Sequence, residues 1–150
     1  MVTGRLLYEY SVTHQGHLII PFVYGVADRE EIYSYQLLSE LGCRGKFHKV
    51  ENPAGFYASN VYSIITIAKD HLDEHSDVID SLDLFKIRYT YRHNLIIVSQ
   101  LAGKYFYDHY PPKELMNIAA PKIFPSEIDC INWVKQGLDR SHSQHNTSLS

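Results

Sequence analysis

The sequence has few of the features that usually identify a metal site, a membrane protein or a secreted protein. Its 150 residues include two cysteines, Cys43 and Cys130, and no CxxC pair, which excludes a structural zinc site made of thiolates. No apolar run approaches the roughly 18 residues that cross a bilayer, and the start of the chain lacks the apolar stretch of a signal peptide. We therefore expect a cytoplasmic protein with reduced thiols and no contact with a membrane.

Motifs that bind phosphates or carry a catalytic serine are also missing. The chain contains no P-loop, no GxGxxG sequence and no GxSxG elbow. A net charge of −3 excludes a generic binder of polyanions, while 45% hydrophobic residues suffice for the core of one domain. No motif names a reaction, so the sequence leaves open whether the protein is an enzyme.

Hydrophobic periodicity and turn residues predict a single α+β domain over residues 1–139. The expected strands cover 5–12, 18–24, 44–50, 84–92, 94–101 and 104–110, and the expected helices cover 28–41, 61–75 and a segment starting near 126. Together they predict a mostly antiparallel sheet, made of an N-terminal hairpin and a three-stranded meander, with about three helices packed on it. The polar segment 140–150 is predicted to be a disordered tail.

Tyrosine is the abundant residue: the chain has twelve, and eight of them form four Tyr-x-Tyr pairs. In a strand, residues two apart point to the same face, so such a pair places two phenols side by side. The face is either a core wall or a binding surface, and the sequence does not decide between them. The candidate interface residues are Tyr8, Tyr10, Tyr89, Tyr91, Tyr105 and Tyr107.

Tyrosine concentrates in protein interfaces. The leading hypothesis is therefore a small non-catalytic module that binds a protein partner, or associates with itself as a homo-oligomer, through a tyrosine-rich sheet.

The charged residues are segregated along the chain. Six acids lie in segment 70–83, whereas cations gather in segments 44–49 and 86–92. The candidate nucleic-acid-binding residues are Arg44, Lys46, Lys49, Lys86, Arg88 and Arg92. The alternative hypothesis is thus a nucleic-acid-binding (DNA-binding) protein or an endonuclease that uses Mg²⁺. Against it, a solvated sheet face with salt bridges to the acidic segment explains the basic stripe better, and no acid-x-Lys nuclease motif occurs in the meander.

One short motif matches a metal-binding pattern. His71, Glu74 and His75 fit H-x-x-E-H, and on a helix the two histidines lie one turn apart, where they could share a divalent metal. A metalloprotease needs a third ligand and a cavity, and such enzymes are much larger than this chain. Histidines near the end of a helix are also favoured by its dipole. No other cofactor is expected.

Overall fold

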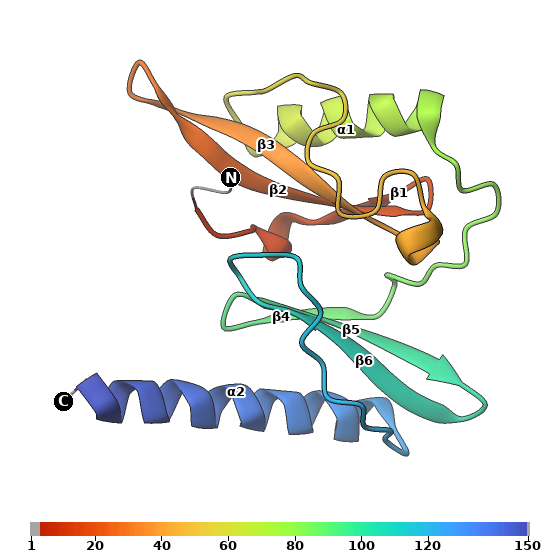
Figure 1. The fold of residues 1–150 in the computed structure, drawn as a ribbon, viewed down its shortest axis with the longest axis vertical. Helices are drawn as coiled ribbons and strands as arrows, with labels where there is room; N and C mark the ends of the chain where they lie inside the picture. The colour runs from red at the N-terminus through yellow and green to blue at the C-terminus, as the bar shows by residue number, and fades with distance from the viewer. Residues whose placement is uncertain (1–3, 150) are drawn as a thin grey trace.

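The computed structural model describes residues 4–149, and their side chains as far as residue 143. In this part of the chain, three strands followed by a helix occur twice (Figure 1). The first unit is β1 (Val12–His14), β2 (His17–Ala27), β3 (Glu30–Ser39) and α1 (Val61–His75). The second is β4 (Arg88–Tyr91), β5 (Asn94–Leu101), β6 (Lys104–Tyr110) and α2 (Glu127–Leu149).

The elements form four layers, in the order α1, sheet A (β1–β2–β3), sheet B (β4–β5–β6) and α2 (Figure 1). Both sheets are antiparallel meanders with the second strand in the middle. The predicted α+β class is confirmed. The details differ, because two stacked sheets replace the single sheet, and the described residues form two α-helices where about three were predicted.

All four hairpins close through two-residue turns in which both residues have positive φ. The turns are Gln15-Gly16, Asp28-Arg29, Arg92-His93 and Ala102-Gly103. This geometry matches the right-handed twist of the flanking strands. Three of the turns lie where the sequence predicts them, whereas the sequence predicts a helix start at Asp28.

The helix predicted over 28–41 is wrong, because this segment is strand β3. The spacing of Ile32, Tyr35 and Leu38 imitates a helical face. In the structure, β3 is buried on both sides: Tyr35 and Leu37 pack under α1, and Leu38 faces sheet B. A strand buried on both faces loses the alternation of polar and apolar residues that would have identified it.

Two predicted strands are also largely wrong. In segment 5–12, Leu6 makes one isolated bridge to Phe22, and Tyr8–Tyr10 then form a 3-10 turn. Segment 44–50 begins in a second 3-10 turn, Gly42–Arg44, and its backbone forms hydrogen bonds to β3 only at Lys49 and Val50. A positive φ at Lys49 interrupts any extended run there.

The helix predicted over 61–75 is confirmed as α1. Its buried residues Ile64, Ile65, Ala68 and Leu72 are those that the periodicity selects. The side chain of Asn60 caps the first turn by accepting the Ser63 N–H at 2.9 Å.

Helix α2 contains most of the segment predicted as a disordered tail. It runs from Glu127 to Leu149, and Ser126 Oγ accepts the Asp129 N–H at 3.1 Å near its start. Side chains from 144 on, and Ser150 as a whole, lie outside the described residues, so the disordered tail stays a prediction. Neither of the two described helices is long and apolar enough to cross a bilayer.

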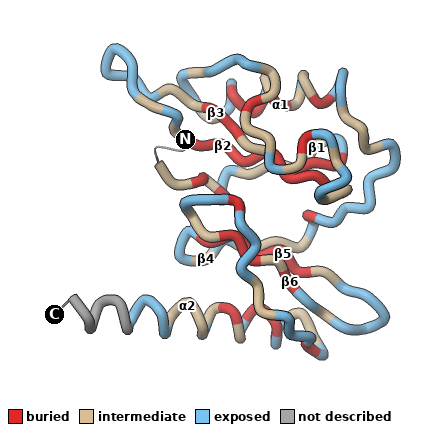
Figure 2. Tube along the Cα trace, in the orientation of Figure 1, coloured by how far each residue is buried: buried red, intermediate tan, exposed pale blue. Residues whose placement is uncertain are grey.

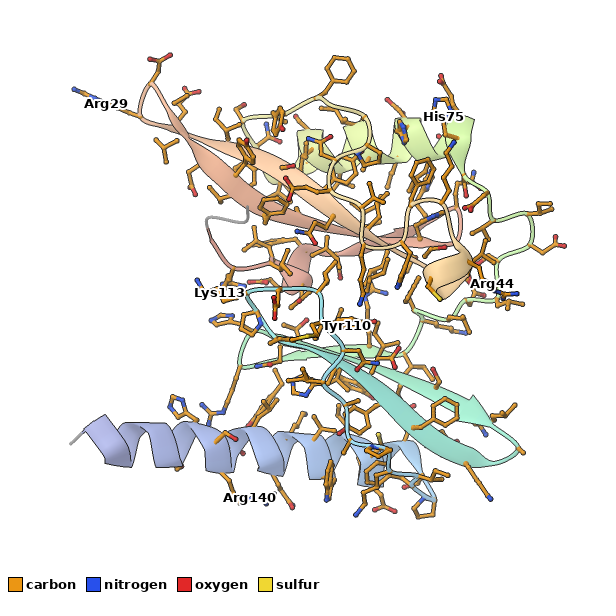
Figure 3. The ribbon with its side chains drawn as sticks, viewed as in Figure 1. Arg29, Arg44, His75, Tyr110, Lys113 and Arg140 are labelled. Atoms are coloured by element: carbon orange, nitrogen blue, oxygen red, sulfur yellow. The ribbon has the colours of Figure 1, made fainter. Side chains whose placement is uncertain are left out.

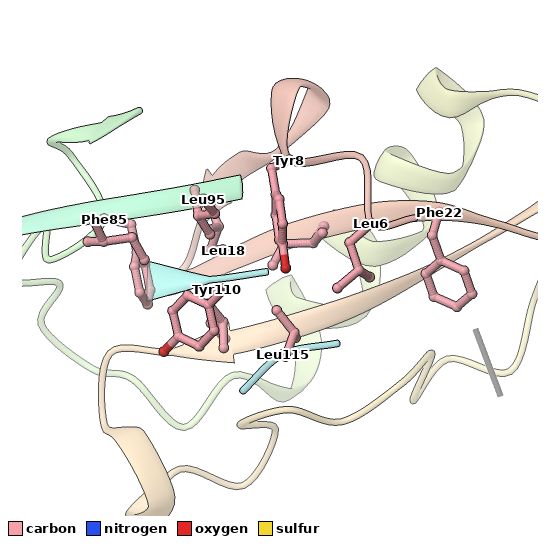
Figure 4. Packing of buried hydrophobic residues seen from close by; sticks show 11 residues of the cluster. Leu6, Tyr8, Leu18, Phe22, Phe85, Leu95, Tyr110 and Leu115 are labelled. Atoms are coloured by element: carbon pink, nitrogen blue, oxygen red, sulfur yellow. The ribbon is translucent and has the colours of Figure 1, made fainter. Parts of the chain in front are cut away.

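The core consists of three layers of apolar side chains that fill the spaces between the four layers of the fold. The central layer joins the sheets and includes Leu18, Phe22, Leu95 and Tyr110, all buried (Figure 4). Two outer layers lie between each sheet and its helix. Buried residues therefore concentrate on β2, β3 and β5 (Figure 2). Each fully buried leucine or phenylalanine contributes about 1.5–3 kcal/mol.

Candidate functional site

The first Tyr-x-Tyr pair does not share a face. Tyr8 and Tyr10 lie in a 3-10 turn, where residues two apart point in different directions. Tyr8 is buried, and its hydroxyl donates to the Pro111 carbonyl at 2.6 Å, which connects the N-terminal segment to the end of β6. Burial raises the pKa of Tyr8 well above its ordinary value. Tyr10 is 51% exposed.

Tyr89 and Tyr91 do share a face of β4, and α2 covers that face. The Tyr89 hydroxyl donates to Glu127, and the Tyr91 hydroxyl donates to Asp139 at 2.7 Å. The Lys135 ammonium lies over both rings, 5.9 and 5.3 Å from their centroids. These phenols therefore attach α2 to sheet B.

Tyr105 and Tyr107 occupy the same face of sheet B on β6. Tyr107 is buried, and its hydroxyl accepts the Ala120 N–H at 3.0 Å. The backbone of Tyr105 pairs with Phe124, so the segment that follows β6 runs along its outer edge. Of the six tyrosines predicted as interface residues, only Tyr10 has an exposed side chain, and the other five are buried or partly buried.

The predicted basic segment 86–92 is split by the structure. Lys86 and Arg88 line one cavity, and Arg88 is half-buried. Arg92 lies beyond β4 and binds Asp139 on α2 at 2.7 Å. The three cations therefore do not form one continuous stripe.

The other predicted basic segment, 44–49, lies at the surface. Arg44, Lys46 and Lys49 are exposed, and Figure 3 shows Arg44 at the edge of the molecule, on the 3-10 turn after β3. Among the described residues, the carboxylates of segment 70–83 form no ion pair with any predicted nucleic-acid-binding cation. Asp73 binds the side chains of His14 and Gln15 instead.

The predicted metal ligands His71, Glu74 and His75 lie in the last turns of α1. The two imidazole rings are 4.7 Å apart, and the His75 Nε2 lies 3.7 Å from a Glu74 oxygen. His71 packs edge-on against Phe47, and burial lowers its pKa. Within the described part of the chain, no three histidine, cysteine or acidic side chains gather as a metal-binding group.

A group of exposed aromatic side chains lies elsewhere, on the outer half of sheet A. The hairpin aromatic surface, as we name it, consists of Tyr24 and Tyr57, which are 41% and 46% exposed. Phe56 and Tyr62, which are 67% and 82% exposed, stand close to Tyr57 in the sequence. Tyr24 is the extra residue of a β-bulge, because Val23 pairs with Tyr33 and Gly25 pairs with Ile32.

Bulges redirect a side chain away from the regular alternation. The Tyr24 ring lies 4.9 Å from that of Tyr57, on the loop that precedes α1. The hairpin aromatic surface therefore joins two segments that are distant in sequence.

Acidic residues lie beside this surface. Burial against neighbours, then Tyr24 and the Glu51 carboxylate, raise the pKa of Tyr57. Glu31 pairs with the exposed Val26 across the hairpin, and Glu30 pairs with Ala27. Arg29 lies at the hairpin tip in Figure 3 and adds a cation to this group.

Two cavities open along the seam between the sheets. The seam cavity has a volume of about 680 Å³, and its walls include Gln15, Glu40, Ser81, Lys86 and Arg88. Glu40 accepts hydrogen bonds from the Ser81 hydroxyl and the Leu82 N–H, both at 2.7 Å. These bonds hold the loop between α1 and β4 against sheet A.

The second cavity is smaller, about 220 Å³, and has titratable groups in its wall. Burial raises the pKa of Asp108 and lowers that of His48, whose Nδ1 accepts the Ser39 N–H at 3.1 Å. Burial, then Asp108, raise the pKa of Tyr110 to about 12. Perturbed groups in a cleft are typical of proton-transfer sites. The volume, however, is below the roughly 300–1,000 Å³ of most small-molecule sites.

Two buried polar atoms near the seam lack hydrogen-bond partners. The His17 Nδ1 lies 2.8 Å from the Gln15 carbonyl. The His17 Nε2 lies 3.9 Å from Asp77 Oδ1, and neither Nε2 nor Oδ1 has a hydrogen-bond partner. The other Asp77 oxygen accepts the Lys46 N–H at 2.7 Å. His17 is completely buried, so this arrangement bears on stability.

Sequence reasoning missed the hairpin aromatic surface and the seam cavity. For the surface, the sequence did contain one signal: the adjacent aromatic residues Phe56 and Tyr57 follow Gly55, a pattern that indicates a loop with exposed rings. Nothing in the sequence places Glu40 and Arg88 at one cavity. The sequence matches no protein family model and no curated protein, and no solved structure matches the fold.

Proposed function

We propose that this protein is a binding module that holds a protein or peptide partner on the hairpin aromatic surface. The observation that supports it is the contact between the exposed rings of Tyr24 and Tyr57 at a β-bulge. Aromatic side chains concentrate at the energetic centres of interfaces. The proposal keeps the function predicted from the tyrosine content and moves it from the sheet faces to the end of one hairpin.

The charges around the surface indicate what the partner carries. Asp28, Glu30, Glu31 and Glu51 lie at or near this end of sheet A, with Arg29 on the hairpin tip. A segment that combines apolar side chains with Lys or Arg would match both the rings and the acids, and cations also bind aromatic faces.

The same charges argue against a second copy of this chain as the occupant. A two-fold symmetric contact would bring two copies of this acid-rich region to one interface, where their like charges repel. A partner of different sequence therefore fits the surface better than a homodimer.

Selection from a random peptide display library tests this proposal. We expect the wild-type protein to enrich peptides that contain Lys or Arg beside large apolar residues. Fluorescence anisotropy of a selected peptide should then show about ten-fold weaker binding to Tyr57→Ser, since one interface aromatic contributes about 1–2 kcal/mol. Added salt should weaken binding further, because the acids contribute charge attraction.

Tyr10→Ser is the matched control, because Tyr10 is another half-exposed tyrosine and lies outside the hairpin aromatic surface. Equal affinity of the wild type and Tyr57→Ser would refute the proposal. Light scattering on the same proteins tests the homo-oligomer. A dimer that Tyr57→Ser dissociates would assign the surface to self-association and would also refute a heterologous partner.

A further inference from the structure

Arg88 differs from the other two arginines that the structure holds in defined hydrogen bonds. Arg5 binds Glu9 at 2.6 and 2.8 Å, and Arg92 binds Asp139 at 2.7 Å. The Arg88 guanidinium donates to three neutral atoms instead: the Phe85 carbonyl at 2.8 Å, the Ser11 carbonyl at 3.1 Å and the Ser11 hydroxyl at 3.3 Å. No described carboxylate lies within ion-pairing distance of it.

The positive charge of Arg88 is therefore fixed in place and uncompensated in the wall of the seam cavity. Burial lowers the pKa of Arg88, which is the expected effect of removing a cation from water without an anionic partner. A half-buried charge without a partner is costly, and a bound anion would remove that cost.

The geometry of the side chain suits an oxyanion. A guanidinium has five N–H groups in a planar fork, and the three bonds of Arg88 use Nε and one N–H on each terminal nitrogen. One N–H on each terminal nitrogen remains to bind an oxygen of a carboxylate or phosphate.

Lys86 supplies a second charge at the same cavity. It is exposed, it forms no described ion pair, and it stands two residues before Arg88 on the approach to β4. Glu40 is an acid in the same wall, and its oxygens accept the Ser81 hydroxyl and the Leu82 N–H. Asp83 is a further acid in the wall, so the specificity of the cavity for an anion depends on how Arg88 and Lys86 place their N–H donors.

We propose that the seam cavity binds a small organic anion, with Arg88 as the fixed anchor of its carboxylate or phosphate group and Lys86 as the second cation. The volume of about 680 Å³ is within the range of small-molecule sites, roughly 300–1,000 Å³. This site lies apart from the hairpin aromatic surface and does not depend on the function proposed for it.

Titration of the ¹⁵N-labelled protein by NMR tests the site, with succinate, inorganic phosphate and AMP as separate probes at constant ionic strength. We expect at least one probe to shift the amides of Gly16, Ser81 and Arg88 in a saturable manner. Saturation by succinate alone indicates a carboxylate ligand, and saturation by phosphate or AMP alone indicates a phosphate ligand.

Variants separate this site from general charge attraction. Lys86→Gln removes no described side-chain hydrogen bond and should weaken binding about ten-fold. Arg88→Lys keeps the charge but loses the planar guanidinium, and it should bind the probe more weakly than Lys86→Gln does. Lys113→Gln is the control, because Lys113 lies at the other end of the seam from Arg44 in Figure 3 and outside the cavity wall, and it should bind as the wild type does.

Three results would overturn the proposal. The first is the absence of saturation by any probe up to about 10 mM, well above the millimolar range of weak specific binding. The second is equal affinity of the wild type and Lys86→Gln, which stays informative even when Arg88→Lys fails to fold. The third is displacement of the probes by a single-stranded oligonucleotide at far lower concentration, which would return these cations to nucleic-acid binding.

Discussion

Replacing Asp77 by asparagine is expected to stabilise the protein, although the substitution removes a charge. The carbonyl of Gln15 can only accept, so the His17 Nδ1 that lies 2.8 Å from it carries the proton, and Nε2 of the neutral ring is an acceptor. Nε2 faces Asp77 Oδ1, another acceptor, at 3.9 Å. In Asp77→Asn the amide oxygen can keep the Lys46 N–H, while the amide NH₂ turns to donate to His17.

The size of the effect follows from these contacts. An unpaired buried acceptor costs about 1–3 kcal/mol, and a new neutral hydrogen bond returns about 1 kcal/mol once the atoms approach to about 2.9 Å. The loss of the charged oxygen at the Lys46 N–H offsets part of this gain. We expect a net increase of about 1 kcal/mol in the free energy of unfolding, or about 2–4 °C in Tm for a domain of this size.

Urea unfolding at pH 8, where imidazole is ordinarily uncharged, measures this change, and the fluorescence of Trp133 reports it. Trp133 suits the assay because its ring packs against Tyr107 and Phe124, 6.2 and 5.6 Å away. Asp80→Asn, in the same loop and exposed, is the control and should stay within about 0.5 kcal/mol of the wild type. A loss of 1 kcal/mol or more in Asp77→Asn would refute the reasoning, since it would mean that His17 is protonated and paired with the Asp77 carboxylate.

Three further predictions concern stability, each measured by the same urea unfolding. Gly16→Ala should cost well over about 1 kcal/mol, because φ is +73° and the new Cβ would lie 2.3 Å from Val78. Gly103→Ala is the control, because Gly103 has φ +74° but open space around it, so it should cost only the roughly 1 kcal/mol of a left-handed residue. Equal costs would show that the Val78 contact is relieved freely. Asp108→Asn should stabilise the protein at pH 7. Burial raises the pKa of Asp108 in the folded state, so the wild type loses stability as the pH rises from the unfolded-state pKa through the folded-state pKa. The difference should vanish near pH 3, where both side chains are neutral, and a destabilised variant at pH 7 would contradict this. Leu95→Ala should cost about 2–5 kcal/mol, because Leu95 is completely buried between the two sheets, and a cost below 1 kcal/mol would mean that the sheets do not share this core.

Local signals in the sequence were sufficient where one face of an element meets water. Helix α1 was predictable because Ile64, Ala68 and Leu72 alternate with exposed polar residues at the helical period. Turns at Gln15-Gly16 and Ala102-Gly103 were predictable because glycine adopts positive φ at low cost. Strand β3 was not, because both of its faces are buried and its apolar spacing also fits a helix.

The candidate sites show the same division. The tyrosine content was visible, but whether a phenol lies inside or outside depends on what covers its strand, and α2 covers Tyr89 and Tyr91. The exposed contact of Tyr24 with Tyr57 depends on a bulge that no local pattern marks. The sequence also placed Arg88 on a basic stripe, whereas the structure holds it on neutral acceptors at a cavity.

The sequence by itself determined the α+β class, helix α1, the meander of sheet B and three of the four tight hairpin turns, because each of these depends on residues close together in the chain. Only the tertiary structure decided that two three-stranded units stack sheet against sheet, since that contact depends on apolar faces far apart in sequence, such as those of Leu18 and Leu95. The same packing decided which tyrosines are covered and which cation is left without a partner. Burial and charge pairing are properties of the assembled layers, and they therefore determine the candidate sites of this protein.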